Sequence, residues 1–239
     1  TKALDEFKPD IVHINNFQRQ LSASIIDAIK EKNIPIVMTA HDLNPICPAS
    51  IMLYDGKPCE ECLTKGYTQC IKKKCNKGST LKSIIGYAEK KYYDCHRVFK
   101  KVDCIISPSE FNKNQFIKGK LNCNKIKVLH NFVNESEHKE YVLGDYAFYF
   151  GRLSKEKGIL NLVEAIKDIP DSKLLIAGDG PERENIEAYI EKHNLGDRIT
   201  LLGYQNQDNI REYIRNSRFI VVPSIWYENC PYSILETLE

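Results

Sequence analysis

Near its C-terminal end the chain reads Phe219-Ile-Val-Val-Pro-Ser224, then Ile225-Trp-Tyr-Glu228-Asn-Cys-Pro231, and then Tyr232-Ser-Ile-Leu-Glu236-Thr-Leu-Glu239. The first piece is rich in branched apolar residues, which predicts a buried strand. The second contains turn residues and ends in a proline, which suits the first turn of a helix. In open α/β sheets ligands bind beyond the carboxyl ends of such strands, and helix N-termini attract anions. Glu228 and Glu236 bracket this turn.

Short apolar runs alternate with helical patterns along the rest of the chain. A strand–helix–strand order with short links predicts parallel sheets and an α/β fold. The polar stretch 131–145 lacks periodicity, so it is predicted to be a linker between a domain at residues 1–130 and a domain at residues 146–239. Besides 219–224, the expected strands are 9–14, 35–40, 102–107, 125–129, 146–150, 173–177 and 199–202, and two of the expected helices are 21–30 and 81–100.

The composition is that of a globular protein. The chain has 239 residues, of which 42% are hydrophobic and 28% charged, values typical of soluble domains. No apolar run approaches the roughly 20 residues that a membrane-spanning helix needs. The N-terminus is polar, shows no signal-peptide pattern and lacks a starting methionine. We therefore expect a cytoplasmic protein whose sequence begins inside a longer chain.

The net charge of +2 conceals an asymmetry. Residues 1–139 carry 23 Lys and Arg against 15 Asp and Glu, a net charge of +8, whereas residues 140–239 carry 11 against 17, a net charge of −6. Much of the positive excess lies between Lys65 and Lys101. This segment predicts peripheral contact with anionic lipid at the inner face of a membrane, or with an anionic acceptor. The alternative is a solvated basic surface. Nucleic acid is not an expected partner, because no known binding motif accompanies the charge.

Two groups of residues at expected strand ends are suited to chemistry. In Gly151-Arg-Leu-Ser-Lys-Glu-Lys-Gly158, Arg152 and Lys157 place two cations before a helix N-terminus, which suits the binding of phosphate. His41, followed by Asp42, lies at the carboxyl end of a strand in the first domain.

Seven stretches, in this order, resemble the retaining glycosyltransferases of family 4, which have the two-domain GT-B fold. They are Pro9-Asp-Ile-Val-His13, His41-Asp42, Ile106-Ser-Pro-Ser109, Val128-Leu-His-Asn-Phe-Val133, the loop 151–158, Gly178-Asp-Gly-Pro181, and the pair Glu228 and Glu236. The resemblance covers nearly the whole chain. It implies two Rossmann-like domains whose parallel sheets face a cleft, an acceptor domain first and a donor domain second. Because family members extend beyond both ends of this sequence, we expect both domains to be incomplete.

The resemblance also implies a reaction and a set of site residues. The reaction is transfer of a sugar, with retention, from a nucleotide-sugar donor to a carbohydrate or lipid-linked acceptor during cell-surface glycan synthesis. The candidate catalytic residues are His41 and Glu228. The candidate donor-binding residues lie at the carboxyl ends of strands in the second domain: Gly151, Arg152, Lys157, Gly178, Tyr204, Asn229, Cys230 and Glu236.

No catalytic metal is expected, because Arg152 and Lys157 would neutralise the phosphates. One alternative function is a non-enzymatic binding module, in which a zinc-bound loop sits on an incomplete enzyme scaffold. Another is a different nucleotide-using GT-B enzyme, such as a sugar-phosphate synthase.

A cysteine-rich insertion at residues 43–79 interrupts the first domain. It has little apolar content, so it needs a cross-link or metal to hold its shape. A structural zinc fits the spacing of its cysteines, with disulfides or free thiols as alternatives. We expect the insertion to form one wall of the acceptor site. The candidate zinc ligands are Cys59, Cys62, Cys70 and Cys75, with Cys47 as an alternate.

Overall fold

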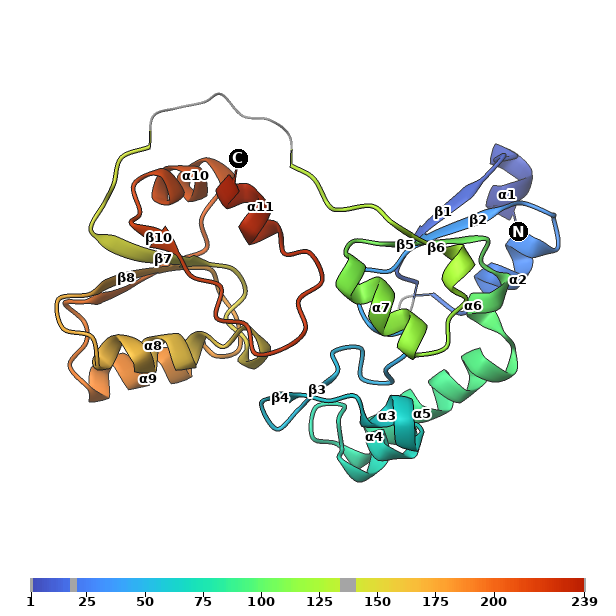
Figure 1. Ribbon diagram of the computed structural model, residues 1–239, viewed down its shortest axis with the longest axis horizontal. Coiled ribbons are helices and arrows are strands. Elements are labelled where there is room, and N and C mark those ends of the chain that lie inside the picture. The colour runs from blue at the N-terminus through green and yellow to red at the C-terminus, as the bar shows by residue number, and fades with distance from the viewer. Residues whose placement is uncertain (1, 18–20, 134–140, 239) are drawn as a thin grey trace. The chain divides into compact units, whose positions relative to one another are not determined.

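The computed structural model describes residues 2–17, 21–133 and 141–238, which form two compact units, Thr1–His130 and Asn131–Glu239 (Figure 1). Each unit contains a four-stranded parallel sheet with helices packed against it. Of the predicted linker 131–145, residues 134–140 lie outside the described part of the chain. Within the described ranges, no helix combines the length and the apolar character needed to cross a membrane.

The sheet of the first unit has the order β1-β2-β5-β6, and every pairing in it is parallel. Its strands are β1 (Val12–Asn15), β2 (Ile36–Thr39), β5 (Cys104–Ser107) and β6 (Ile126–Val128). The neighbouring helices are α1 (Lys2–Phe7), α2 (Ser24–Lys30), α6 (Val98–Lys101) and α7 (Glu110–Lys118), and a 3₁₀ turn, η1 (Cys123–Lys125), precedes β6. Buried apolar side chains from strands and helices fill the space between them, among them Ile26, Ile36, Ile105 and Phe116.

The helix predicted at residues 81–100 is interrupted in the structure. α5 (Thr80–Cys95) ends before His96, and α6 begins at Val98. Arg97 between them has a left-handed backbone, with φ of 52°, which a continuous right-handed helix cannot contain. The helical character predicted for residues 81–100 is therefore confirmed, but it is divided between two helices, because apolar spacing alone does not show a break.

The insertion 43–79 contains short regular elements. A two-stranded hairpin, β3 (Leu53–Tyr54) and β4 (Lys57–Pro58), turns at Asp55 and Gly56, which both have positive φ. Asp-Gly is a favoured sequence for such a turn. Two five-residue helices follow, α3 (Glu61–Lys65) and α4 (Thr68–Lys72), and α4 packs against α5.

The second unit has the sheet order β10-β7-β8-β9, again with parallel pairing. α8 and α9 pack on one face, where Val163 and Ile186 are fully buried beside Leu174 and Ile176, and α10 packs on the other (Figure 1). The strands are β7 (Tyr146–Phe150), β8 (Lys173–Ala177), β9 (Ile199–Gly203) and β10 (Phe219–Ile220). The helices are α8 (Ile159–Lys167), α9 (Arg183–Lys192), α10 (Gln207–Arg215) and α11 (Tyr232–Leu238), with a 3₁₀ turn, η2 (Lys155–Lys157), before α8.

The prediction of a buried strand at residues 219–224 was wrong in length and burial. β10 comprises only Phe219 and Ile220, and Phe219 is 54% exposed. Within the described sheet, β10 pairs with β7 alone. The N–H of Val221 still donates to the Phe148 carbonyl at 3.0 Å, but Pro223 has no N–H with which to extend the ladder.

The carboxyl ends of β7, β8 and β9 are joined through backbone at glycines. The N–H of Gly151 donates to the Ala177 carbonyl at 3.0 Å, and the N–H of Gly178 donates to the Gly203 carbonyl at 2.7 Å. Gly178 has φ of +132°, and a Cβ there would lie 1.9 Å from the carbonyl oxygen of Gly151. Only glycine fits this close approach, so Gly178 sets the spacing between the loops that follow β7 and β8.

We predict that Gly178→Ala lowers the free energy of unfolding by about 1–3 kcal/mol from backbone strain alone, with a further cost from the contact with Gly151. Urea denaturation measures the change. Gly196→Ala is the matched control, because a Cβ at Gly196 meets nothing within 4 Å and its φ lies outside the left-handed range. Equal stability of the two variants would contradict the assignment of Gly178.

Candidate functional site

The loop after β7 carries the cations predicted to bind phosphate. It is fixed by backbone contacts to the turn after β8: the N–H of Leu153 donates to the Asp179 carbonyl at 2.9 Å, and the N–H of Glu182 donates to the Leu153 carbonyl at 3.0 Å. Leu153 and Ser154 are buried, whereas Arg152, the residue before them, is exposed. The loop is therefore anchored on its inner side and presents the Arg152 guanidinium to solvent.

Gly158 ends this loop and begins α8. Its φ is +67°, and a Cβ at this position would lie 2.2 Å from the carbonyl oxygen of Pro223. The N–H of Ile225 donates to the Glu156 carbonyl at 3.0 Å. The loop after β7 and the loop after β10 thus run against each other, backbone to backbone.

An ion pair joins these two loops. Lys157 Nζ lies 2.7 Å from Glu228 Oε1, and the side chains are 26% and 20% exposed. Ser224 Oγ donates to the same carboxylate oxygen at 2.5 Å. The Lys157 ammonium also lies 5.4 Å from the centre of the Trp226 ring, within the range of a cation–π contact.

The environment of Glu228 favours its ionised form. Burial raises the pKa of this carboxyl, but the bonds from Lys157 and Ser224 outweigh burial and place the pKa below the ordinary value for glutamate. Glu228 is therefore a carboxylate at neutral pH, and a carboxylate accepts hydrogen bonds without donating any.

The structure brings only some of the predicted donor-binding residues together. Gly151 and Gly178 are in backbone contact, and Lys157 pairs with Glu228. Asn229 and Cys230 continue the Glu228 loop and are half-buried, as is Glu236 on α11. Tyr204 follows β9 and is 84% exposed; within the described residues, no hydrogen bond or ion pair joins it to Lys157 or Glu228.

Three residues of this region were not among the predicted site residues. Ser224 and Trp226 contact the Lys157–Glu228 pair, and Asn131 Nδ2 donates to the Cys230 carbonyl at 2.9 Å. Ser224 and Trp226 lie within four positions of Glu228, so their closeness in sequence could have suggested them. Nothing in the sequence pairs Asn131 with Cys230, which lies 99 residues later.

In the first unit, His41 belongs to a polar cluster at the carboxyl ends of β1 and β2. His41 Nε2 lies 3.3 Å from Asn15 Oδ1, and the His41 N–H donates to Asn16 Oδ1 at 3.4 Å. Asn16 Nδ2 donates to Asp42 Oδ2 at 3.3 Å. His41 is exposed. Asn15 and Asn16 were not among the predicted site residues, although both directly follow a predicted strand.

The basic segment from Lys65 to Lys101 is not uniformly exposed. Lys90 is 4% exposed; it pairs with Asp94 Oδ1 at 2.5 Å and faces the Tyr67 ring at 5.0 Å. Burial lowers the pKa of Lys90. The exposed lysines of the segment include Lys72, Lys74, Lys77, Lys82 and Lys91.

One side of α5 exposes apolar side chains to solvent. We call this set the α5 stripe: Leu81, Ile84, Ile85 and Tyr92. Their spacing places them on one face of the helix. Lys82 and Lys91 flank the stripe, one on each side, by the same helical geometry. Such a face, apolar at its centre and basic at its margins, is typical of helices that lie on anionic membranes.

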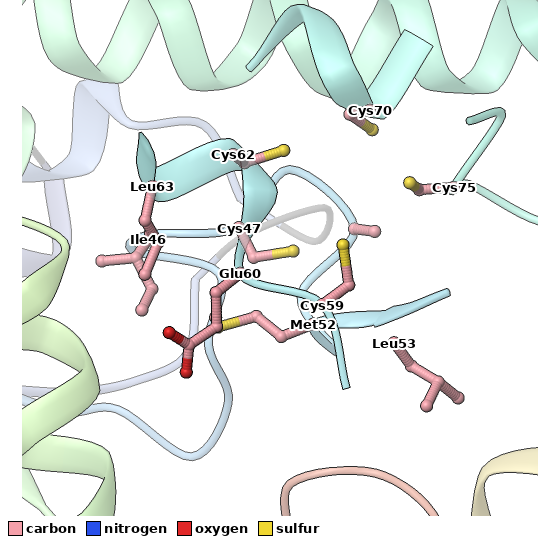
Figure 2. Close-up of a pocket in the computed structure, with 11 residues that line it drawn as sticks. Ile46, Cys47, Met52, Leu53, Cys59, Glu60, Cys62, Leu63, Cys70 and Cys75 are labelled. Carbon is pink, nitrogen blue, oxygen red and sulfur yellow. The ribbon is translucent and has the colours of Figure 1, made fainter. Parts of the chain in front are cut away.

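Five cysteines of the insertion line a single cavity (Figure 2). In the structure none of the nine cysteines, all of which lie in the described ranges, forms a disulfide. Burial, followed by the nearby Cys47 and Cys75 thiols, raises the pKa of Cys62 to about 12. Over the described ranges, no three Cys, His, Asp or Glu side chains are already arranged to hold a metal ion, so the zinc prediction stays a prediction at this stage.

Comparison with known proteins gives two family matches. The model described as Glycosyltransferase Family 4 matches residues 1–137, more than half of the chain, and the model described as Glycosyl transferases group 1 matches residues 133–239. The junction between the matches lies close to the boundary between the two structural units.

Similar individual proteins are also glycosyltransferases by name. An uncharacterised glycosyltransferase of Methanocaldococcus jannaschii is 37% identical over 124 residues, which are 51% of this chain and 34% of the relative. The alpha-D-kanosaminyltransferase of Streptomyces kanamyceticus is 35% identical over 94 residues, which are 38% of this chain and 24% of that enzyme. The chain thus spans about a third or less of the length of these relatives.

A solved structure covers nearly the whole chain. Anabaena HepE in complex with UDP matches with a TM-score of 0.66 and 15% identity over 99% of this chain and 59% of HepE. This likeness confirms the predicted GT-B type of fold, with a parallel α/β sheet in each unit. On the family match and the fold together, the chain belongs to glycosyltransferase family 4.

Proposed function

We propose that the complete protein transfers a sugar, with retention of anomeric configuration, from a nucleotide-sugar donor to a carbohydrate or lipid-linked acceptor in cell-surface glycan synthesis. The observation that carries the proposal is the Lys157–Glu228 pair, which joins two loops at the carboxyl edge of the second sheet. This is the edge at which α/β sheets bind ligands. Supporting it, HepE was solved with UDP, and the Streptomyces relative is named alpha-D-kanosaminyltransferase.

In this proposal Arg152 and Lys157 bind the diphosphate of the donor. Departure of the diphosphate concentrates negative charge on its oxygens, and fixed cations stabilise that charge most strongly where water is excluded. Lys157 has three N–H donors, so it can hold Glu228 and a phosphate oxygen at the same time. Glu228 then serves to orient the Lys157 ammonium as well as to contact the donor sugar. Neutralisation of the phosphates by these two side chains requires no catalytic metal.

The remaining site residues have proposed roles that follow their chemistry. Glu236 would accept hydrogen bonds from the ribose hydroxyls, because an ionised carboxylate only accepts. The backbone amides of Asn229 and Cys230 would bind the donor sugar beside Glu228, and Tyr204 would lie near the base. In the acceptor unit, His41 would contact the sugar, with its ring held by Asn15 at 3.3 Å.

We also infer that the first unit contacts the cytoplasmic face of a membrane through the α5 stripe. The stripe supplies apolar side chains that can enter the lipid headgroup region, and its flanking lysines complement anionic lipid. Lys90 takes no part, because it is buried against Tyr67. Contact of this kind would bring the acceptor unit to a lipid-linked substrate.

The reaction is tested with the complete protein and a panel of UDP-, GDP- and ADP-sugars, each offered with carbohydrate, lipid-linked and sugar-phosphate acceptors. We expect acceptor-dependent release of nucleoside diphosphate from one donor, and NMR should show that the anomeric configuration is retained. Transfer to a sugar phosphate alone would instead identify a sugar-phosphate synthase. A folded protein that uses no donor would contradict the proposal and favour the binding module.

Arg152→Ala and Lys157→Ala should each weaken binding of the nucleoside diphosphate by about 1.5–3 kcal/mol, the range for hydrogen bonds to charged groups. Isothermal titration with the diphosphate that is the product of the active donor measures this. Lys167→Ala is the control, since Lys167 lies at the opposite end of α8 from Gly158 and its loss changes the net charge equally. Equal weakening in all three variants would show that only overall charge matters.

The ion pair predicts an acid-sensitive part of the stability. Because the pKa of Glu228 is lowered in the folded chain, its carboxylate stabilises the fold fully above the ordinary glutamate pKa of about 4.3, and this contribution is lost as pH falls through the lower folded value. The difference in free energy of unfolding between the wild type and Glu228→Gln should therefore shrink in acid. Glu164→Gln, at an exposed position on α8, is the control. A difference that does not vary with pH would contradict this assignment.

Membrane contact is tested by co-sedimentation with vesicles. Binding to vesicles that contain phosphatidylserine should exceed binding to pure phosphatidylcholine, and it should fall as salt screens the lysines. Replacing Ile84 and Ile85 by Glu should weaken it strongly. Ile169→Glu, which alters an exposed isoleucine of the second unit, should have little effect. Equal binding to both vesicle types would contradict the proposed recognition of anionic lipid and would show that the lysines form only a solvated surface.

A further inference from the structure

The cavity in the insertion is lined by an unusual set of side chains. Its volume is about 20 Å³, and Cys47, Cys59, Cys62, Cys70 and Cys75 line it together with apolar residues such as Met52. Figure 2 shows the five sulfur atoms turned toward a common centre. A cavity of this size has room for about one water molecule. It therefore has room for one metal ion but not for a larger cofactor.

Short elements with little stability of their own carry four of these cysteines. Cys59 directly follows β4, and Cys62 lies in α3, whereas Cys70 lies in α4 and Cys75 follows it. Helices of five residues are not stable in isolation. The hairpin and the two short helices therefore need a common attachment, and the centre of the cysteine cavity is the point that all of them share.

Donor groups around the cavity are placed to support thiolates. Lys73 Nζ lies 3.7 Å from Cys59 Sγ, and Asn76 Nδ2 lies 3.9 Å from Cys70 Sγ. Hydrogen bonds from outer residues to ligand atoms are characteristic of protein metal sites. Lys73 also pairs with Glu61 Oε1 at 2.6 Å, which holds the ammonium beside Cys59.

Cys47 differs from the other four. It is buried, and it precedes the hairpin and the two short helices that carry or flank the other four cysteines. Its backbone is already fixed, because the Cys47 N–H donates to the Leu43 carbonyl at 2.8 Å and the Cys47 carbonyl accepts from the Ser50 N–H at 2.9 Å. Cys47 therefore does not depend on a metal for its position, and Cys47→Ser offers a matched control for the ligands.

We propose that Cys59, Cys62, Cys70 and Cys75 bind one Zn²⁺ ion as a structural tetrathiolate site, with Cys47 packed beside it as a fifth, non-ligating thiol. No group of three ligands is yet arranged for a metal in the described residues, so binding must draw the four sulfurs inward to zinc–sulfur distances of about 2.3 Å. The thiols give up protons to solvent as the ion binds. Four thiolates fill a tetrahedral site and leave no position for substrate.

Hydrogen bonds connect this site to the polar cluster of the first unit. The Cys59 N–H donates to the Met52 carbonyl at 2.7 Å, and the Leu43 N–H donates to the Ser50 carbonyl at 3.1 Å. The Asn44 N–H donates to Asp42 Oδ1 at 2.8 Å. Zinc would thus fix the segment that begins directly after His41 and Asp42, and so shape the acceptor side of the proposed enzyme.

The first test is metal analysis of the complete protein, purified without added metal or chelator. We expect about one zinc ion per chain, as a closed tetrathiolate site holds one. Cys59→Ser, Cys62→Ser, Cys70→Ser and Cys75→Ser should each lose most of the zinc, and Cys47→Ser should retain it. Iron with sulfide, a disulfide, or five freely titratable thiols without metal would overturn the proposal. Loss of zinc from Cys47→Ser, with retention in any of the other four, would overturn the ligand assignment.

A second measurement covers ligand variants that fail to fold. Zinc is removed from the wild type with a strong chelator and then restored, while hydrogen exchange is followed by mass spectrometry. Exchange in residues 43–79 should rise by at least about tenfold on removal, as for loss of local structure worth roughly 1.4 kcal/mol, and it should return with zinc but not with Mg²⁺. Exchange in the second unit should not change. Unaltered exchange in 43–79 would overturn the structural role, and neither readout depends on the proposed transferase activity.

Discussion

Two neighbouring strands can run parallel only if the chain crosses back over a face of the sheet before the second strand begins. This constraint determines where chemistry can occur in each unit, because every strand then ends at the same edge. In the second unit that edge gathers the loops after β7, β8 and β10, and backbone contacts at Gly151, Gly158 and Gly178 hold them at fixed spacing. The Lys157–Glu228 pair forms because those backbones are so close.

The parts of the fold predicted best were those with strong and local patterns. The predicted strands 146–150 and 173–177 coincide with β7 and β8, because each is mostly apolar and packs side chains on both faces of the sheet. The run at 219–224 is just as apolar, yet only Phe219 and Ile220 are paired as β10. β10 is shorter than β7 and β8 because it lies at the margin of the described sheet and because Pro223 lacks an N–H. The hydropathy of the sequence shows neither its place at the margin nor the missing hydrogen bond.

For the site residues too, local sequence motifs were predicted, whereas contacts between distant segments were not. Arg152, Lys157 and Glu228 were selected because they resemble a known motif, but no pattern shows that Lys157 contacts Glu228, since 71 positions separate them. The basic segment is a second example. From the sequence alone, Lys90 is predicted to be exposed like the neighbouring lysines. In the structure its position on α5 directs its side chain toward Tyr67 and Phe99 and away from solvent. Contacts between distant segments, and the choice of helix face, depend on packing that a single sequence does not display.

The pairing of Lys157 has a consequence for selectivity among cellular anions. Free phosphate and other small anions are abundant in cells and would bind any exposed ammonium group. At Lys157 a carboxylate 2.7 Å away already neutralises much of the ammonium charge, and its own negative charge repels a second anion. A small anion makes too few other contacts to offset this repulsion. In the proposed site, a larger ligand that also contacts Arg152 and the neighbouring loops would offset it while Lys157 keeps its bond to Glu228, so the carboxylate would exclude weak anions without closing the site.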